Sequence, residues 1–195
     1  TKLVWIETPA NPTWSVTDIA AAADIAHRAG ALLGVDSTVA TPVLTRPLAL
    51  GADIVMHAAT KYLNGHSDLI AGALVVREDG ELWQRVRKVR AQVGGTLGSF
   101  EAWLLLRGMR TLFVRVPAAC RGAQQIAEHF AKHPKILAVL YPGLPSAQGH
   151  AVAAREIAPL HRDDAQVESG AAILSRRAMR LSSPTVALPS AMLAK

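Results

Sequence analysis

The sequence predicts an α/β fold in which a mostly parallel sheet carries helices on both faces. The main evidence is four short apolar runs, at residues 3–7, 31–35, 52–56 and 70–76. Continuous apolar runs of this length are typical of strands that are buried on both faces. Helical patterns or long loops separate the runs, and such connections indicate crossovers between parallel strands.

The helices are predicted from apolar residues that recur at spacings of three and four. The first helix begins at Thr17, a residue type that caps helix starts, and ends before Gly30, which suits a helix C-terminus. Pro117 interrupts the later helical pattern and predicts a domain boundary near residues 114–118. A further strand is expected at residues 136–140. The remaining helices are expected at residues 80–92, 100–114 and 115–132.

The composition excludes several classes of protein. Of the 195 residues, 50% are hydrophobic and 18% are charged, which is enough to bury a core. Cys120 is the single cysteine, so an internal disulfide is excluded and we expect a reducing, cytoplasmic location. No apolar run approaches the roughly 18 residues of a membrane span, and no membrane partner is predicted.

The basic character of the chain raises the question of nucleic acid. The net charge is +6, and the densest basic cluster falls in a predicted helix, at Arg85, Arg87, Lys88 and Arg90. Neither interleaved aromatic residues nor a nucleic-acid motif accompanies this cluster, which favours a solvated helix face over a nucleic-acid surface. His57 and His66 lack the spacing of metal ligands on one helix face, so no metal site is predicted.

Two polar residues follow the ends of neighbouring predicted strands. Asp36 ends the run 31–35, and Lys61 follows the run 52–56 within the sequence HAATKY. Ligands of open α/β sheets bind beyond the carboxyl ends of the strands, where these two side chains would share a crevice. Pyridoxal phosphate needs a lysine for its Schiff base and a carboxylate that keeps its ring nitrogen protonated. On spacing alone, a surface lysine and a turn-capping aspartate remain open alternatives.

Six long motifs follow one another along residues 1–155. They are ETPANP (7–12), GVDSTVATPV (34–43), LGADIVMHAATKYLNGHSD (50–68), AGALVV (71–76), EAWLLLRGMRTLFVRV (101–116) and HPKILAVLYPGLPSAQGHAVAAR (133–155). Together they resemble the Cys/Met-metabolism family of pyridoxal-phosphate enzymes, which includes cystathionine γ-synthase, cystathionine γ-lyase, methionine γ-lyase and the O-acylhomoserine sulfhydrylases.

The resemblance implies roles for four residues. Lys61 matches the lysine that forms the Schiff base with pyridoxal 5'-phosphate and moves protons on the substrate. Asp36 matches the carboxylate that pairs with the pyridinium nitrogen, Thr60 a phosphate-binding hydroxyl, and Asn11 a residue near the cofactor ring. The implied fold is the aspartate-aminotransferase type (fold type I), incomplete at both ends. Homo-oligomers are expected, because family sites are built between two subunits.

The resemblance also implies a division into domains. Residues 1–116 would form part of the cofactor-binding large domain, and residues 117–155 the start of the smaller C-terminal domain. Residues 156–195 are expected to be a divergent tail, disordered or translated from a shifted reading frame. The family's N-terminal phosphate loop and the C-terminal arginine that holds the substrate carboxylate have no counterpart here.

One departure lies inside the site, because Ala58 stands where the family has a serine. The missing hydrogen bond to phosphate would cost on the order of 1.5–3 kcal/mol of cofactor binding. The function implied is γ-elimination or γ-replacement on cystathionine, methionine or an O-acylhomoserine, or an inactive remnant of such an enzyme. The alternative is a non-catalytic chain that binds a partner such as an intact homologous subunit.

Overall fold

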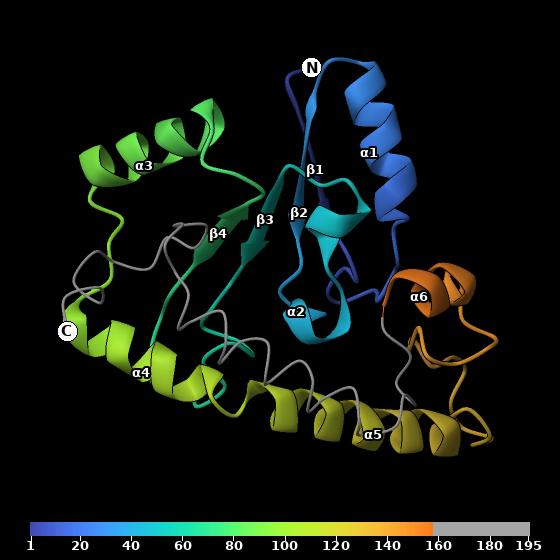
Figure 1. Ribbon diagram of the computed structural model, residues 1–195. Helices are drawn as coiled ribbons and strands as arrows, with labels where there is room; N and C mark the ends of the chain where they lie inside the picture. Colours follow the sequence, from blue (N-terminus) through green and yellow to red (C-terminus); the bar gives the residue numbers. More distant parts are fainter. Residues whose placement is uncertain (158–195) are drawn as a thin grey trace.

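The computed structural model describes residues 1–157, which form a four-stranded sheet and the helices around it (Figure 1). The strand order is β1-β2-β3-β4, and the first three strands are parallel. The sheet is therefore mostly parallel, as predicted. The strands are β1 (Leu3–Glu7), β2 (Leu32–Asp36), β3 (Ile54–His57) and β4 (Ala73–Val76).

The strand β4 is the exception, because it runs antiparallel to β3. The connection between them, residues 58–72, contains turns and no helix. For β4 to run parallel to β3, the connection would have to cross over and return the chain to the end of the sheet where β3 begins, usually through a helix. Without one, the chain turns back at the carboxyl end of β3 and pairs in the reverse direction.

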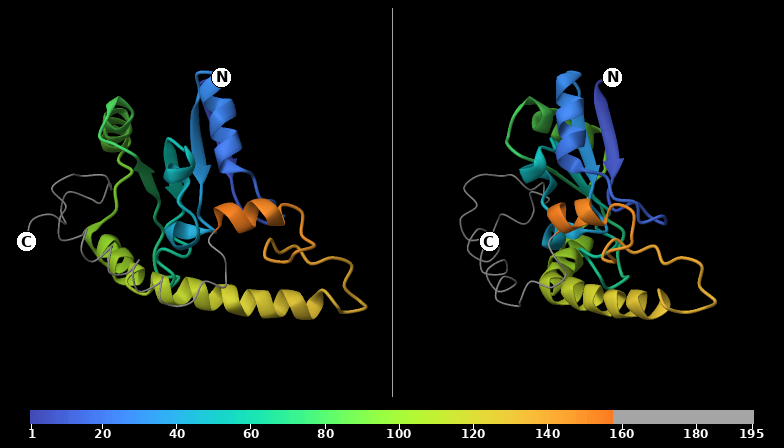
Figure 2. Two further views of the ribbon diagram at one scale, coloured as in Figure 1. Left: turned by 45° about the vertical axis from the view of Figure 1, so that its right-hand side comes forward. Right: turned by 90° about the vertical axis from the view of Figure 1, so that its right-hand side faces the viewer.

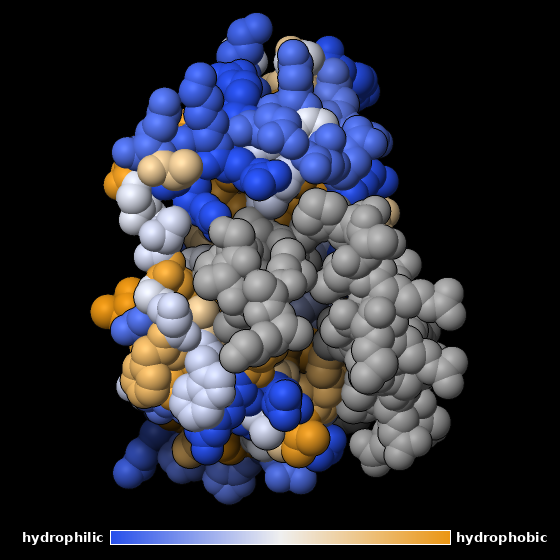
Figure 3. All heavy atoms as spheres, turned by 60° about the vertical axis from the view of Figure 1, so that its left-hand side comes forward, coloured by the Kyte–Doolittle hydropathy of each residue, from blue (hydrophilic) through white to orange (hydrophobic). Residues whose placement is uncertain are grey.

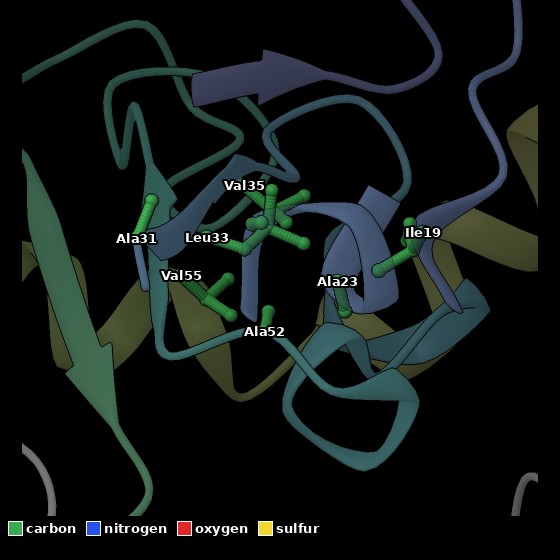
Figure 4. Close-up of a cluster of buried hydrophobic side chains, with 8 residues drawn as sticks. Ile19, Ala23, Ala31, Leu33, Val35, Ala52 and Val55 are labelled. Atoms are coloured by element: carbon green, nitrogen blue, oxygen red, sulfur yellow. The ribbon is translucent and has the colours of Figure 1, made fainter. Parts of the chain in front are cut away.

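The helix α1 (Ile19–Arg28) covers one face of the sheet. The Asp18 side chain caps its start by accepting a hydrogen bond from the Ala21 N–H at 2.8 Å, and Gly30 follows its end with φ +66°. The core lies between α1 and the strands, and Figure 4 shows side chains of both meeting there. Its buried residues are Ile19, Ala23, Ala26, Ala31, Leu33, Val35, Ala52 and Val55.

The helix α3 (Glu81–Val93) covers part of the opposite face. Its Trp83 is buried against Ile54 and Val76 of β3 and β4. The predicted helices on both faces are thus confirmed. The basic residues of α3 lie mostly on its solvent side, and in Figure 3 the upper region where α3 lies is largely hydrophilic.

The helices α4 (Ser99–Met109) and α5 (Leu112–Phe130) run along the edge where β1, β2 and β3 end (Figure 2). They bury a second core against the segment that follows β3, consisting of Ala59, Leu63, Leu69, Leu105, Leu112 and Val116. The expected interruption at Pro117 is wrong, because Pro117 lies inside α5. The helical break lies earlier, at Arg110 and Thr111.

Three shorter helices complete the described chain: α2 (Thr41–Leu44), the 3₁₀ helix η1 (Pro47–Leu50) and α6 (His150–Glu156). The strand expected at residues 136–140 is not formed, and Leu137 and Leu140 are exposed. A strand needs a neighbour for its backbone hydrogen bonds, and none pairs with this segment.

All but the first two residues of the predicted tail at 156–195 lie outside the described residues. Within residues 1–157, no helix is both long enough and apolar enough to cross a bilayer.

Candidate active site

The ends of β2 and β3 bring two of the predicted site residues to one edge of the sheet. Asp36 is the last residue of β2 and lies opposite Met56 of β3 in the parallel register. Lys61 follows β3 by four residues, in a helical turn that we call the Lys61 turn, residues 59–65. Because parallel neighbours end at the same edge, both residues stand at the carboxyl edge of the sheet.

Asp36 is half-buried and has spare capacity to accept hydrogen bonds. Its Oδ1 accepts a hydrogen bond from the Thr38 N–H at 2.9 Å, and its Oδ2 accepts none from the described residues. A carboxylate has about four acceptor positions, so most of this group is available to a ligand. The half-burial also keeps its negative charge less screened than that of a fully solvated carboxylate.

His57 lies beside Asp36, and the fold favours its neutral form. Burial lowers the pKa of His57, and the Ser37 carbonyl and the Asp36 charge offset this only in part. Its Nδ1 is 3.1 Å from the Ser37 carbonyl oxygen. A carbonyl can only accept, so Nδ1 carries the proton and Nε2 is the free acceptor of the neutral ring.

Lys61 is exposed, and its side chain is held by no partner within residues 1–157. Its backbone is fixed, because the Lys61 N–H donates to the Ala58 carbonyl at 3.0 Å and its own carbonyl accepts from the Gly65 N–H at 2.7 Å. Neither a hydrogen bond nor an ion pair of Nζ is formed with the described residues. The amine is therefore presented from a rigid backbone to the space outside the turn.

Thr60 is bound within the chain through both its backbone and its side chain. Its hydroxyl accepts from the Ala71 N–H at 2.9 Å and donates to the Ala71 carbonyl at 3.3 Å. The donated bond is longer than the usual 2.7–2.8 Å for a hydroxyl, so this proton is weakly held. Ala58 offers no hydroxyl, and its N–H is already bound to Thr38 Oγ1 at 2.7 Å.

A wide hollow of about 810 Å³ opens beside the Lys61 turn. Thr60 and Lys61 line it together with Tyr62, Asp68 and Arg115. Asp36 and Asn11 are not part of this lining. Asn11 is an exposed loop residue whose N–H donates to Glu7 Oε1 at 3.2 Å. The structure thus groups Thr60 with Lys61 and places Asp36 at the neighbouring strand end.

The groups present fit the needs of pyridoxal phosphate at two points. An amine without a partner and a half-buried carboxylate with free acceptor positions occupy one edge of the sheet. On the phosphate side, the Thr60 hydroxyl and the backbone of its turn are the donors that this part of the chain supplies. Reasoning from the sequence does not identify Arg115, which lines the hollow beside Lys61. Arg115 contacts residues of the Lys61 turn that lie more than 50 positions earlier in the chain, and no sequence pattern indicates these contacts.

The comparisons with known proteins point to one family. Residues 1–161 match the family model described as Cys/Met metabolism PLP-dependent enzyme. L-methionine γ-lyase of Porphyromonas gingivalis is 49% identical over 159 residues, covering 81% of this chain and 40% of that protein. Cystathionine γ-synthase of Mycobacterium tuberculosis is 45% identical over 157 residues, with 80% and 40% covered.

Solved structures agree with the sequence matches. Cystathionine γ-synthase from Xanthomonas oryzae pv. oryzae, in complex with aminoacrylate and cysteine, superposes with a TM-score of 0.76 at 44% identity. The match covers 82% of this chain and 41% of that one. The metB structure from Corynebacterium glutamicum has a TM-score of 0.78 at 43% identity, with 82% and 41% covered. The chain therefore spans about two fifths of the length of the relatives it matches.

Proposed function

Because this chain belongs to the Cys/Met metabolism PLP-dependent enzyme family, we propose that it holds pyridoxal 5'-phosphate covalently through Lys61 and acts on sulfur amino acids. The observation that supports the proposal is that Lys61, whose amine has no partner among the described residues, follows β3, and Asp36 ends the neighbouring parallel strand β2. Asp36, Thr60 and Asn11 are the further residues that we assign to cofactor binding.

Each of these groups has a defined task. When bound, pyridoxal phosphate supplies an electron-poor ring that stabilises negative charge at the α-carbon of an amino acid. Asp36 keeps the ring nitrogen protonated by charge pairing, since an ionised carboxylate stabilises a neighbouring cation. Lys61 removes and returns protons on the substrate once its amine is free. The Thr60 hydroxyl, whose hydrogen bond to the Ala71 carbonyl is long, would donate instead to a phosphate oxygen.

The substrate class that we propose is supported by the activities of the relatives. They include a methionine γ-lyase, a cystathionine γ-lyase and a cystathionine γ-synthase. We therefore propose elimination or replacement at the γ-carbon of methionine, cystathionine or an activated homoserine. A cytoplasmic, homo-oligomeric enzyme is part of the same proposal.

Trapping the cofactor with borohydride tests the assignment of Lys61. The chain is incubated with pyridoxal phosphate, reduced and digested, and its peptides are analysed by mass spectrometry. We expect a pyridoxyl adduct on Lys61 that Lys61→Ala abolishes, whereas Lys132→Ala, a change at another exposed lysine, leaves it in place. An adduct spread evenly over surface lysines would contradict the proposal. Release of a keto acid from cystathionine or an O-acylhomoserine then tests the reaction.

One observation supports the alternative of a partner-binding chain. Leu3, Trp5, Leu32 and Leu74 are all at least 36% exposed, and the strand registers place them on the sheet face opposite α1. This apolar face would suit an intact homologous subunit, whose length exceeds that of this chain. Sedimentation of the chain with and without a full-length relative tests it. A complex that Trp5→Asp disrupts, without any adduct at Lys61, would favour this alternative.

A further inference from the structure

The guanidinium of Arg115 joins α4, α5 and the Lys61 turn. Its Nη1 donates to the Tyr62 carbonyl at 3.0 Å, and its Nη2 lies 3.5 Å from the Asn64 carbonyl oxygen. The same Nη2 donates to the Gly108 carbonyl in the last turn of α4 at 3.0 Å. Its Nε donates to Thr111 Oγ1 at 2.9 Å. One side chain on α5 thus holds two carbonyls of the turn that carries Lys61.

The donors of Arg115 are directed at the protein itself. A guanidinium has five N–H donors, and four contacts to protein acceptors account for most of them. No carboxylate lies within ion-pair distance among residues 1–157. Although Arg115 lines the hollow beside Lys61, its hydrogen bonds therefore serve the backbone of the turn and the C-terminus of α4. A cation is also favoured at a helix C-terminus by the helix dipole.

Two glycines make this contact possible. Gly65 has φ +71°, and a Cβ there would come within 2.0 Å of Arg115 Nη1. A Cβ on Gly108 would come within 2.2 Å of the Asn64 carbonyl oxygen. A side chain at Gly108 would push the turn away from α4, because it would meet the Asn64 backbone, whereas one at Gly65 would displace the Arg115 guanidinium from its carbonyls. The turn, the end of α4 and the guanidinium are therefore packed as one unit.

We propose that Arg115 is a positioning residue for Lys61. Lys61 directly precedes Tyr62, so fixing the Tyr62 and Asn64 carbonyls fixes the backbone from which the amine projects. A reactive group gains from such fixation because less freedom is lost when it meets its partner. The proposal rests on the proposed function, since it treats Lys61 as the reactive group.

The test compares Arg115→Met and Arg115→Lys with Arg121→Met, a change at an exposed arginine on the same helix. Amide hydrogen exchange is followed at Asn64 and Gly65, whose N–H groups bond within the Lys61 turn, and at Ala29 after α1 as a distant reference. In parallel, the initial rate of borohydride-trapped pyridoxyl adduct at Lys61 is measured at limiting pyridoxal phosphate.

For Arg115→Met we expect exchange at Asn64 and Gly65 to accelerate about tenfold or more, with Ala29 unchanged. The rate of adduct formation at Lys61 should fall several-fold, because the turn loses at least one hydrogen bond from a charged group. Arg115→Lys should restore only part of both, because an ammonium lacks the planar fork that reaches separate carbonyls. Arg121→Met should behave as the unmodified chain. If Arg115→Met does not fold, Arg115→Lys supplies the same comparison.

Three results would overturn the proposal. One is exchange at Asn64 and Gly65 that Arg115→Met leaves unchanged. Another is acceleration that is equal at Ala29, because this would mean a general loss of stability. The last is that Arg115→Lys fully restores both the amide exchange and the rate of adduct formation. A failure of the proposed function is separate, because it appears as absence of the Lys61 adduct in the unmodified chain, while the exchange data still decide whether Arg115 fixes the turn.

Discussion

Ala58 stands in the candidate site at the position where the family resemblance implies a serine. It is half-buried, and its N–H is bound to Thr38 Oγ1 at the start of the loop that leads to Lys61. The methyl side chain cannot donate a hydrogen bond, so position 58 offers no donor to the phosphate of the cofactor that we propose for this site.

Restoring the hydroxyl should strengthen cofactor binding. We expect Ala58→Ser to lower the Kd for pyridoxal phosphate about ten- to a hundredfold, the value of a hydrogen bond to a charged acceptor. Titration of the absorbance of the lysine-bound cofactor measures this, with Ala20→Ser on the exposed side of α1 as a matched control. Equal affinity in Ala58→Ser and the control would show that position 58 does not face the phosphate.

His57 gives the fold a pH dependence of defined sign. Burial is the main reason that its pKa lies below the ordinary value of 6.5. The unfolded chain therefore takes up this proton more readily, and the stability linked to neutral His57 is fully present above pH 6.5. It is lost as the pH falls from there through the lower pKa of the folded state.

We expect His57→Asn to flatten this part of the pH dependence. The asparagine amide can replace Nδ1 as the donor to the Ser37 carbonyl without carrying a titrating group. Urea unfolding at about pH 5 and about pH 7.5 gives the difference in unfolding free energy for each variant. The same change at the exposed His129 should leave the difference as it is. A steeper loss at low pH in His57→Asn than in the unmodified chain would contradict this account.

At the scale of elements, α5 shows how packing overrides a local signal. A proline inside a helix loses one hydrogen bond and clashes with the preceding turn, at a cost of about 3 kcal/mol. Leu112 and Val116 of α5 are buried in the second core, next to Leu63 of the Lys61 turn and Leu105 of α4. Burying these two side chains contributes roughly 1.5–3 kcal/mol each, and Cys120, beyond Pro117, packs against the same core, so packing on both sides of the proline offsets its cost.

Substitution at Pro117 tests this balance. We expect Pro117→Ala to raise the free energy of unfolding by up to about 3 kcal/mol, because it restores an N–H and removes the clash. Ala118→Gly, at the next and exposed position, should lower it by about 1 kcal/mol if the segment is helical. Urea unfolding measures both. A loss of stability in Pro117→Ala would mean that the proline is needed where it stands.

At the scale of the whole molecule, Glu156 ties α6 to the start of α1 across 137 positions of sequence. Its side chain is buried, and Oε2 accepts from the Ile19 N–H at 2.9 Å. Thr45 Oγ1 donates to the Glu156 carbonyl at 2.7 Å and joins the end of α2 to the same point. A carboxylate at a helix N-terminus also interacts favourably with the helix dipole.

We expect Glu156→Ala to lower the free energy of unfolding by about 1–3 kcal/mol, because a buried N–H of α1 loses its acceptor. Glu156→Gln should cost less, since the amide oxygen still accepts. Arg155→Gln, which removes an exposed pair with Asp18 and a 3.4 Å contact with Glu156 Oε1 but leaves the Glu156–Ile19 hydrogen bond in place, should cost under about 1 kcal/mol. If Glu156→Ala costs no more than Arg155→Gln in urea unfolding, the tie does not contribute to stability.

The whole molecule also agrees with the fold class expected from the sequence. The aspartate-aminotransferase-like architecture, with a mostly parallel sheet and helices on both faces, is confirmed by solved relatives at TM-scores of 0.76 to 0.78. The membership of the family is confirmed over residues 1–161. The division into domains at residues 116 and 155, and the roles of the site residues, stay predictions.

The sequence by itself determined features that depend on neighbouring residues or on long motifs. Continuous apolar runs predicted the four strands of the sheet, and α1 lies within its predicted segment, because burial and capping are properties of neighbouring residues. Lys61 and Asp36 were found because each follows such a run. Tertiary structure alone decided the direction of β4, the continuity of α5 through Pro117 and the absence of a strand at residues 136–140. It also decided the contacts of Arg115 and Glu156, since these join segments 50 or more positions apart whose meeting depends on how the elements pack.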